Sequence, residues 1–131
     1  MPITQQLDTA RHRILTTVTG EITFADVRSH LEAVRSADAF TYAELVDARG
    51  AGEPRPSASV IWNAAELFRT VRHRTPVGPR AIVVRSEFDF GLARVFAMLV
   101  SPAIAVHVFR DSGEAEAWLE RATVAERAPT G

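Results

Sequence analysis

The chain has 131 residues, of which 47% are hydrophobic and 24% are charged, so its length and composition suit one folded domain with one core. The net charge of −1 gives no broad electrostatic attraction to nucleic acid or anionic lipid. The sequence contains no cysteine, and all 15 of its basic residues are arginine, which excludes disulfides, thiolate nucleophiles, Schiff-base lysines and a phosphate-binding loop with its lysine.

The first part of the sequence predicts a β-hairpin followed by a helix. Two runs with alternating side chains, residues 3–7 and 13–19, are separated by a short polar turn, which is typical of a hairpin. Thr23 is expected to cap the helix, because Asp26 follows three residues later as in a capping box. The predicted core stripe of this helix contains Val27, Leu31 and Val34.

A strand, a loop and a second helix occupy the middle of the chain. The strand is predicted for residues 44–47, and the loop after it contains two glycines and two prolines. The helix begins near Ser57, and Trp62 lies off its apolar side, which predicts partial exposure of the indole. The apolar positions span a wide arc that predicts a well-buried helix: Val60, Ile61, Ala64, Ala65, Leu67, Phe68 and Val71.

Two further strand-and-helix units complete the chain. Residues 81–84 form a continuous apolar run, typical of a strand covered on both faces, and residues 105–109 predict the last strand. Ser86 is expected to cap the third helix, and Gly91 within it is expected to permit close packing on the sheet. The predicted core face of this helix contains Phe88, Leu92, Val95, Phe96 and Leu99. The inner stripe of the last helix contains Ala115, Trp118, Leu119 and Ala122.

The predicted order of elements is therefore ββαβαβαβα in a single α/β domain. A hairpin that leads into right-handed βα units gives a mixed, mainly parallel sheet of about five strands with four helices packed on it. The domain is expected to cover residues 1–124, and residues 125–131 are expected to form a flexible C-terminal tail.

Four stretches in this order share the pattern of one protein class. They are residues 20–23 before the first helix, 44–49 in the central strand, 91–96 in the third helix and 108–119 at the end. Together they resemble the small stand-alone bacterial proteins of the STAS/SEC14-like class, which have the fold of the sporulation anti-anti-sigma factor. The resemblance covers most of the chain and implies a STAS-like fold, although many such proteins have no assigned role.

The resemblance also implies a position for a regulatory serine. In the anti-anti-sigma branch, a phosphorylatable serine stands at the start of the helix after the central strand, in an Asp-Ser-Ser/Thr-Gly-like motif. Ser57 and Ser59 occupy that place here, but the neighbouring aspartate and glycine of the motif are missing. Both serines are therefore candidate site residues, without the motif that marks phosphorylation.

Charged residues at the strand ends are candidate ligand-binding residues. Asp47 ends the central strand at the edge where ligands bind in open α/β sheets. Arg49, Arg85 and Arg110 each follow a predicted strand, and if they meet at one end of the sheet they would receive a phosphate or carboxylate group. The equally favoured alternative is that all three are simply exposed to solvent. For Asp47, a structural role is the favoured alternative, either in an ion pair with Arg49 or as the cap of a loop amide. Trp62 is the candidate anchor for a protein partner or a second subunit, with burial beneath the loop of residues 49–57 as the equally favoured alternative.

The sequence supports two binding functions. The first is a non-enzymatic, STAS-like regulatory or interaction module that acts through protein–protein contacts, with a homodimer as one form. The second is a binder of a small anionic or amphipathic, lipid-like ligand at the carboxyl ends of the strands. An enzyme is least favoured because no catalytic motif occurs, and no cofactor or metal is expected because the four histidines lack the spacing of metal ligands.

A cytoplasmic location is expected, with no membrane insertion and no nucleic-acid partner. The N-terminus lacks the basic and apolar regions of a secretory signal. The longest apolar region, residues 95–109, is interrupted by polar residues and is too short to cross a bilayer.

Overall fold

The computed structural model describes residues 2–127 and contains five strands and four helices. The strands are β1 (Ile3–Asp8), β2 (Arg13–Gly20), β3 (Ala43–Ala51), β4 (Arg80–Val83) and β5 (Val106–Phe109). The helices are α1 (Phe24–Ser36), α2 (Ala58–Arg74), α3 (Glu87–Val100) and α4 (Ser112–Arg127). The predicted α/β class and the order ββαβαβαβα are confirmed.

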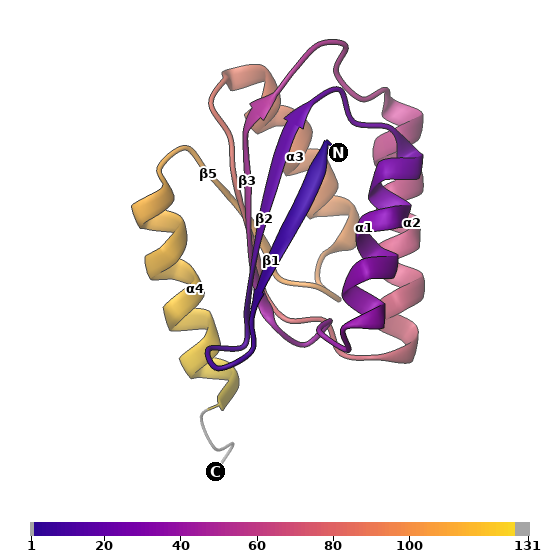
Figure 1. The fold of residues 1–131 in the computed structure, drawn as a ribbon. Helices are drawn as coiled ribbons and strands as arrows, with labels where there is room; N and C mark the ends of the chain where they lie inside the picture. Colours follow the sequence, from indigo (N-terminus) through magenta and orange to yellow (C-terminus); the bar gives the residue numbers. More distant parts are fainter. Residues whose placement is uncertain (1, 128–131) are drawn as a thin grey trace.

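The strands form one sheet in which neighbours along the chain are also neighbours in space. β1 pairs antiparallel with β2, and the other three pairings are parallel. Parallel crossovers are right-handed, and here each one steps in the same direction across the sheet, so α1, α2 and α3 all lie on one face. α4 follows the last strand and covers the opposite face (Figure 1).

Short polar residues cap three of the helices, and two of them, Thr23 and Ser86, were predicted as caps. Thr23 Oγ1 accepts a hydrogen bond from the backbone N–H of Asp26, and the Asp26 carboxylate accepts one from the N–H of Thr23, which completes a capping box. Ser57 and Ser86 each accept a bond from the N–H three residues later. Each cap satisfies a backbone donor that the first helical turn leaves free, and contributes about 1 kcal/mol.

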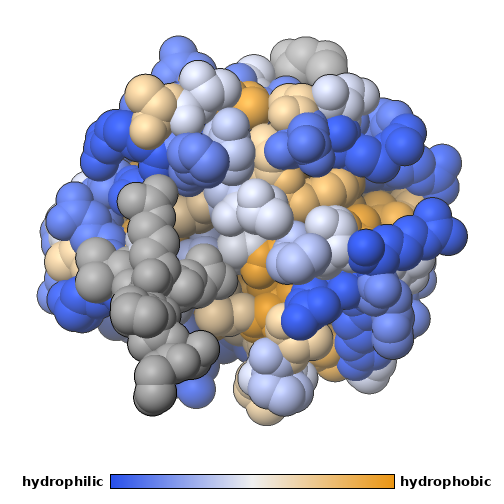
Figure 2. Space-filling view, turned by 90° about the horizontal axis from the view of Figure 1, so that it is seen from below, coloured by the Kyte–Doolittle hydropathy of each residue, from blue (hydrophilic) through white to orange (hydrophobic). Residues whose placement is uncertain are grey.

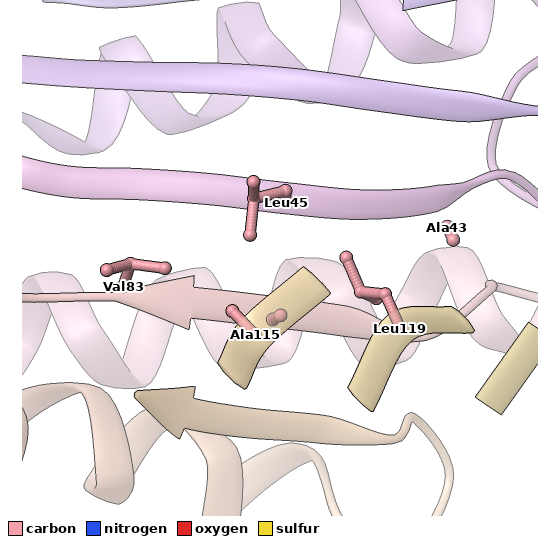
Figure 3. Close-up of a cluster of buried hydrophobic side chains, with 6 residues drawn as sticks. Ala43, Leu45, Val83, Ala115 and Leu119 are labelled. Carbon is pink, nitrogen blue, oxygen red and sulfur yellow. The ribbon is translucent and has the colours of Figure 1, made fainter. Parts of the chain in front are cut away.

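The face of the sheet beneath α4 carries a close-packed apolar cluster. Leu45 of β3 and Val83 of β4 project toward α4 and meet Ala115 and Leu119 (Figure 3). Val83, Ala115 and Leu119 have no exposed surface. Burial of one large aliphatic side chain contributes roughly 1.5–3 kcal/mol, so this cluster holds α4 on the sheet. The predicted inner positions Ala115 and Leu119 are confirmed.

β3 is longer than the predicted strand. It continues to Ala51, four residues beyond the predicted end, because Thr19 and Gly20 of β2 pair with Gly50 and Ala51. Arg49 therefore belongs to the strand, and the loop to α2 begins at Gly52.

The predicted core face of α3 is wrong at two positions. Phe88 and Val95 are exposed, because the side of α3 that faces the sheet carries Leu92 and Phe96. The expectation for Gly91 is wrong as well: apart from its chain neighbours and the backbone of its own helix, no atom of the described chain lies within 4 Å of the position that a Cβ at Gly91 would take. Gly91 thus faces away from the sheet, and α3 is apolar on its outer side as well as its inner side.

The C-terminal part of the chain is helical as far as Arg127. Residues 125–127 of the predicted tail belong to α4, and the remainder of that tail lies outside the described residues. Among the helices described, none is long and apolar enough to cross a membrane.

Candidate functional site

A partly open cavity of about 210 Å³ lies between the sheet and helices α1, α2 and α3. Val46 and Ala48 of β3 and Ile82 of β4 form part of its floor, and Ile61 of α2 and Leu92 of α3 form part of its roof. An apolar cavity of roughly 150 Å³ is large enough to bind benzene. The space beneath the three helices is therefore sufficient for a small ligand.

The exposure of the side chains around the cavity shows that this side of the sheet is incompletely filled. Val46 and Ile82 lie on inner strands beneath helices, yet both are only half-buried. Of the residues of α2, all of which the structure describes, Ala64 and Ala65 alone are buried, so the prediction of a well-buried helix is wrong. Val60, Ile61 and Phe68 of α2 line the cavity, whereas Leu67 and Val71 pack against a buried cluster that includes Leu31 and Val34 of α1.

The cavity is elongated along the strands. Its lining residues on β3 extend from Glu44, next to the first residue of the strand, to Ala51 at the end. Since a strand rises about 3.3 Å per residue, these two residues lie roughly 20 Å apart. A long and narrow space of this kind fits an extended molecule better than a compact one.

Polar side chains close the cavity near the amino ends of the parallel strands. The Glu44 carboxylate accepts a hydrogen bond of 2.5 Å from Thr16 Oγ1, and its Oε2 lies 2.8 Å from His30 Nε2. Its Oε1 lies 3.2 Å from Arg80 Nε, and Gln5 Oε1 lies 3.1 Å from His30 Nδ1. Glu44, Thr16, His30 and Arg80 are buried. Because these groups bind one another, this end of the cavity offers little free polar surface to a ligand.

Glu44 is charged at neutral pH in spite of its burial. Burial by itself raises the pKa of a carboxyl group, but the charge of Arg80 and hydrogen bonds from His30 and Thr16 outweigh it and lower the pKa of Glu44 from 4.5 to about 2. Arg80 is held in place by its Nη1, which donates to the carbonyl of Tyr42 at 2.7 Å. The network thus neutralises a buried carboxylate with a buried guanidinium.

An ion pair spans the other end of the cavity, at the carboxyl ends of the strands. Arg55, in the loop between β3 and α2, donates to the two carboxylate oxygens of Asp89 on α3 over 2.6 and 3.2 Å. Both residues line the cavity. Glu53 lies 3.2 Å from Arg55 Nη1 and adds a second acidic group. This ion pair therefore holds the loop against α3 beside the cavity. Arg55 is also the cation that the polar end of a ligand would contact there.

The predicted site residues Asp47 and Arg49 lie on the opposite face of the sheet from the cavity. Side chains alternate along a strand, and Val46 and Ala48 line the cavity, so Asp47 and Arg49 project toward the face that α4 covers. Arg49 donates to both carboxylate oxygens of Asp47, at 2.9 and 2.8 Å, and these hydrogen bonds lower the pKa of Asp47. The structural ion pair between the two residues, predicted as the alternative to a ligand site, is confirmed.

The arginines that follow β4 and β5 have different surroundings. Arg85 is exposed, and its charge contributes to the lowered pKa of Asp47. Arg110 forms an ion pair of 2.5 Å with Glu87 of α3, and its guanidinium lies 4.5 Å from the ring centroid of Phe90. Arg85 is thus associated with the face of Asp47, whereas Arg110 is engaged with α3.

The other predicted site residues belong to the start of α2 and lie on the surface. The Ser57 hydroxyl caps the helix, and both Ser57 and Ser59 are exposed. Trp62 is exposed too, as its place off the apolar arc predicts. All three residues are accessible, and their role in binding stays a prediction.

The residues at the two ends of the cavity were not among the predicted site residues. Glu44 and Arg80 are opposite charges at the start of two apolar strands that pair in register. His30 is a polar residue one position from Leu31 in the core stripe of α1. Charged or polar residues at buried positions of neighbouring elements are the signal that would have indicated the network. Arg55 and Asp89 carry no such signal, because one lies in a loop and the other in a helical first turn.

The histidines take no part in a metal site within the described chain. No group of three or more His, Asp or Glu side chains there is arranged to hold a metal ion. His30 belongs to the Glu44 network, and the ring of His107 stacks on Trp118 with the ring centroids 4.6 Å apart.

A second hollow, of about 390 Å³, lies between α1 and α2 at the end of the molecule seen in Figure 2. Hydrophobic side chains are visible there in recesses between hydrophilic ones (Figure 2). Leu31 and Leu67 contribute apolar surface, and Arg28, Arg35 and Arg74 contribute charge. This charged groove differs from the cavity under α2 and α3, whose walls are almost entirely apolar, and the cavity is therefore the candidate site.

The mixed five-stranded sheet, with three helices on one face and one on the other, defines a SpoIIAA-like, STAS-like fold. A similar solved structure is that of an uncharacterized protein from the DUF3478 family with a SpoIIAA-like fold, from Shewanella loihica PV-4. The match has a TM-score of 0.59 and covers 89% of this chain and 91% of that one. The two sequences are 19% identical, so the likeness is one of fold. No protein-family model and no curated protein matches the chain. The predicted STAS-like fold is confirmed.

Proposed function

We propose that the protein is a cytoplasmic STAS-type regulatory module that binds a small, elongated, mainly apolar ligand between its sheet and helices α1–α3. The cavity of about 210 Å³ is the observation that supports this proposal. It favours the second of the two sequence-based hypotheses over the first. The ligand lies beneath the loop after β3 and on the cavity side of the sheet, away from Asp47.

The walls of the cavity indicate the chemistry of the ligand. Apolar side chains line it from Val46 and Ile82 on the sheet to Leu92 and Phe96 on α3, so a hydrocarbon body gains roughly 25 cal/mol for each Å² that it buries. The Glu44 end is closed by groups that already bind one another. The polar head of the ligand therefore lies at the Arg55 end, where the guanidinium donates to a carboxylate or hydroxyl oxygen in competition with Asp89.

The same geometry favours binding over catalysis. The titratable groups that line the cavity are paired: Glu44 with Arg80 and His30, and Arg55 with Asp89. A general acid or base needs a proton-transfer partner in the substrate within hydrogen-bond reach. Groups that are already neutralised by neighbours are suited to close a pocket, which is the role that we assign to Glu44, Arg80 and His30, whereas Arg55 binds the head group in competition with Asp89.

The test measures binding of octanol and octanoate, which share one alkyl chain and differ in the head group, by isothermal titration calorimetry. Binding with a negative heat-capacity change is expected for both, because apolar surface is buried. Ala48→Leu places a larger side chain in the cavity and is expected to weaken binding at least about tenfold. Ala117→Leu makes the same change on the exposed side of α4 and is expected to leave binding unchanged.

Two results would contradict the proposal. One is the absence of saturable binding of either compound to a folded protein. The other is equal binding by the wild type and Ala48→Leu, which would place the ligand elsewhere. A preference for octanoate that is lost in Arg55→Gln would assign the head group to Arg55, whereas equal affinity for both compounds would assign binding to the hydrocarbon alone.

A further inference from the structure

We propose that the protein forms a two-fold symmetric homodimer in which α3 of one copy packs antiparallel against α3 of a second copy. Six large apolar side chains of the described residues are exposed, and four of them lie on the neighbouring helices α2 and α3. These four are Trp62, Phe88, Val95 and Met98, with exposed fractions of 54%, 62%, 45% and 70%. Apolar surface gathered in one region is typical of an interaction site.

The outer face of α3 has the repeat of a helix-pairing surface. Phe88, Gly91, Val95 and Met98 are all exposed, and they follow one another at intervals of three, four and three residues. This is the spacing of the a and d positions in paired helices. Leu92 lies on the cavity side of the helix, so the pairing surface is separate from the surface that α3 presents to its own sheet.

Gly91 gives a second, independent indication that the outer face of α3 packs against another helix. A glycine inside a helix costs about 1 kcal/mol relative to alanine. Apart from its chain neighbours and the backbone of its own helix, no atom of the described chain lies within 4 Å of the position of its missing Cβ, so the fold of one copy does not require a glycine there. Close approach of a second helix at this point does require a small residue, because a side chain would hold the two backbones apart.

Antiparallel pairing makes the surface complementary to itself. With the two-fold axis on the outer side of α3, at the level of residue 93 along the helix, Phe88 of one copy faces Met98 of the other, and Gly91 faces Val95. Large side chains then meet at the two ends, and the glycine receives the valine in the middle. Parallel pairing would place Gly91 opposite Gly91 and leave a gap. Antiparallel helices also bring opposite ends of their dipoles together. A second copy of this chain is therefore the occupant that the surface fits.

Trp62 extends the surface onto α2. Arg69, two turns further along the same side of α2, donates to the carbonyl of Leu99 on α3 at 2.9 Å, so this side of α2 borders α3. With exposed fractions of 54% and 62%, Trp62 and Phe88 each leave roughly 100 Å² of aromatic surface in solvent. The surface is smaller than the roughly 800 Å² per partner of a standard interface. The dimer is therefore expected to dissociate in about the micromolar range.

The first experiment measures the molar mass by sedimentation velocity from about 1 µM to about 500 µM protein. The wild type is expected to shift from monomer to dimer within this range. Val95→Glu and Met98→Glu are expected to remain monomeric, because each places a charge in the pairing surface. Leu15→Glu, at an exposed apolar residue on the other face of the sheet, is expected to dimerise as the wild type does. A wild type that stays monomeric throughout, or a Val95→Glu variant that dimerises normally, would overturn the proposal.

The second experiment tests the direction of the helices and uses the absence of cysteine from the chain. Phe88 and Met98 lie about 15 Å apart along α3, and a disulfide requires Cα atoms within about 7 Å. In an antiparallel dimer, a mixture of Phe88→Cys and Met98→Cys therefore forms a mixed disulfide, and neither variant alone forms a disulfide dimer. Cross-linking of Phe88→Cys with itself would refute antiparallel pairing.

The dimer can be tested independently of the proposed ligand. Its surface lies on the outer side of α3, whereas Ala48 lies in the cavity on the sheet. Ala48→Leu is accordingly expected to leave the dimerisation constant within about twofold of the wild-type value. Loss of dimerisation in this variant would show that the α3 surface depends on cavity packing and would overturn the assignment to α3 alone.

Discussion

The buried carboxylate of Glu44 is expected to make the stability of this protein depend on pH in a defined way. Its pKa is about 2 in the folded protein, against 4.5 without its neighbours. The folded state therefore binds a proton less readily than the unfolded state, and the contribution of Glu44 to stability is complete above about pH 4.5 and decreases as the pH falls toward 2. Acid is expected to destabilise the protein through this group.

The size of the effect follows from the two pKa values. At 1.36 kcal/mol for each pH unit, a pKa lowered from 4.5 to about 2 corresponds to about 3 kcal/mol at neutral pH. About 2 kcal/mol of this is lost between about pH 6 and about pH 3, because the carboxyl group of the unfolded chain is by then largely protonated. A single domain has roughly 5–15 kcal/mol of stability, so a loss of this size is measurable.

The assay is urea unfolding of the wild type and of Glu44→Gln from about pH 6 to about pH 3. At neutral pH, Glu44→Gln leaves the charge of Arg80 buried without its carboxylate and is expected to cost about 3–5 kcal/mol. The difference between the two proteins is expected to shrink by about 2 kcal/mol toward pH 3. Glu120→Gln, the same change at an exposed position of α4, is expected to follow the wild type.

A constant difference between the wild type and Glu44→Gln across this range would refute the reasoning. It would mean that Glu44 titrates alike in the folded and unfolded states, in spite of Arg80 and His30. If Glu44→Gln is too unstable to unfold reversibly, the carboxyl carbon of Glu44 in the wild type can be followed by NMR. A titration midpoint near 4.5 would contradict the structure, and a midpoint well below it would support the network.

Four further substitutions test the packing and capping described above. Leu119→Ala empties a fully buried position under α4 and is expected to lower the unfolding free energy by about 3 kcal/mol; a loss below about 1 kcal/mol would contradict close packing there. Thr23→Ala removes the capping box and is expected to cost about 1 kcal/mol, with Thr23→Ser as the control that keeps the cap. Gly91→Ala is expected to stabilise the dilute protein by up to about 1 kcal/mol, since a Cβ meets nothing there, and a loss of stability would indicate an unseen contact. Arg49→Ala, at an exposed ion pair, is expected to change the unfolding free energy by less than about 1 kcal/mol. A larger loss would mean that the pair stabilises the protein more than an exposed ion pair does.

Local sequence patterns were sufficient for the elements of this fold and for their order. Thr23 and Ser86 could be identified as caps because capping depends on residues within one helical turn. The alternating side chains around Ile14 and Thr16 predicted β2 in the same way, because the two-residue period of a strand depends only on neighbouring residues. The mainly parallel pairing followed from the succession of right-handed βα units, whereas the order of the strands in the sheet was not predicted.

The candidate site could not be predicted in this way, because its groups are distant in the sequence. In the sequence, Glu44 is only the first residue of an apolar strand. In the folded chain, His30 from α1 and Arg80 from β4 lie against its carboxylate. Arg55 and Asp89 meet across the carboxyl ends of two strands, and only the sheet brings them there. Asp47 was predicted at the end of the central strand, but β3 continues to Ala51, so Asp47 lies within the strand and projects away from the cavity.

The sequence by itself determined which segments are helices and strands, and that α2 and α3 are rich in apolar residues. The tertiary structure decided what those residues do. Leu119 is packed, Leu92 lines a cavity, and Phe88 is exposed, although all three have the same hydrophobic character and helical spacing. Hydrophobicity is a property of the side chain, whereas burial depends on the shape and distance of the surface opposite, and that surface exists only once the chain has folded.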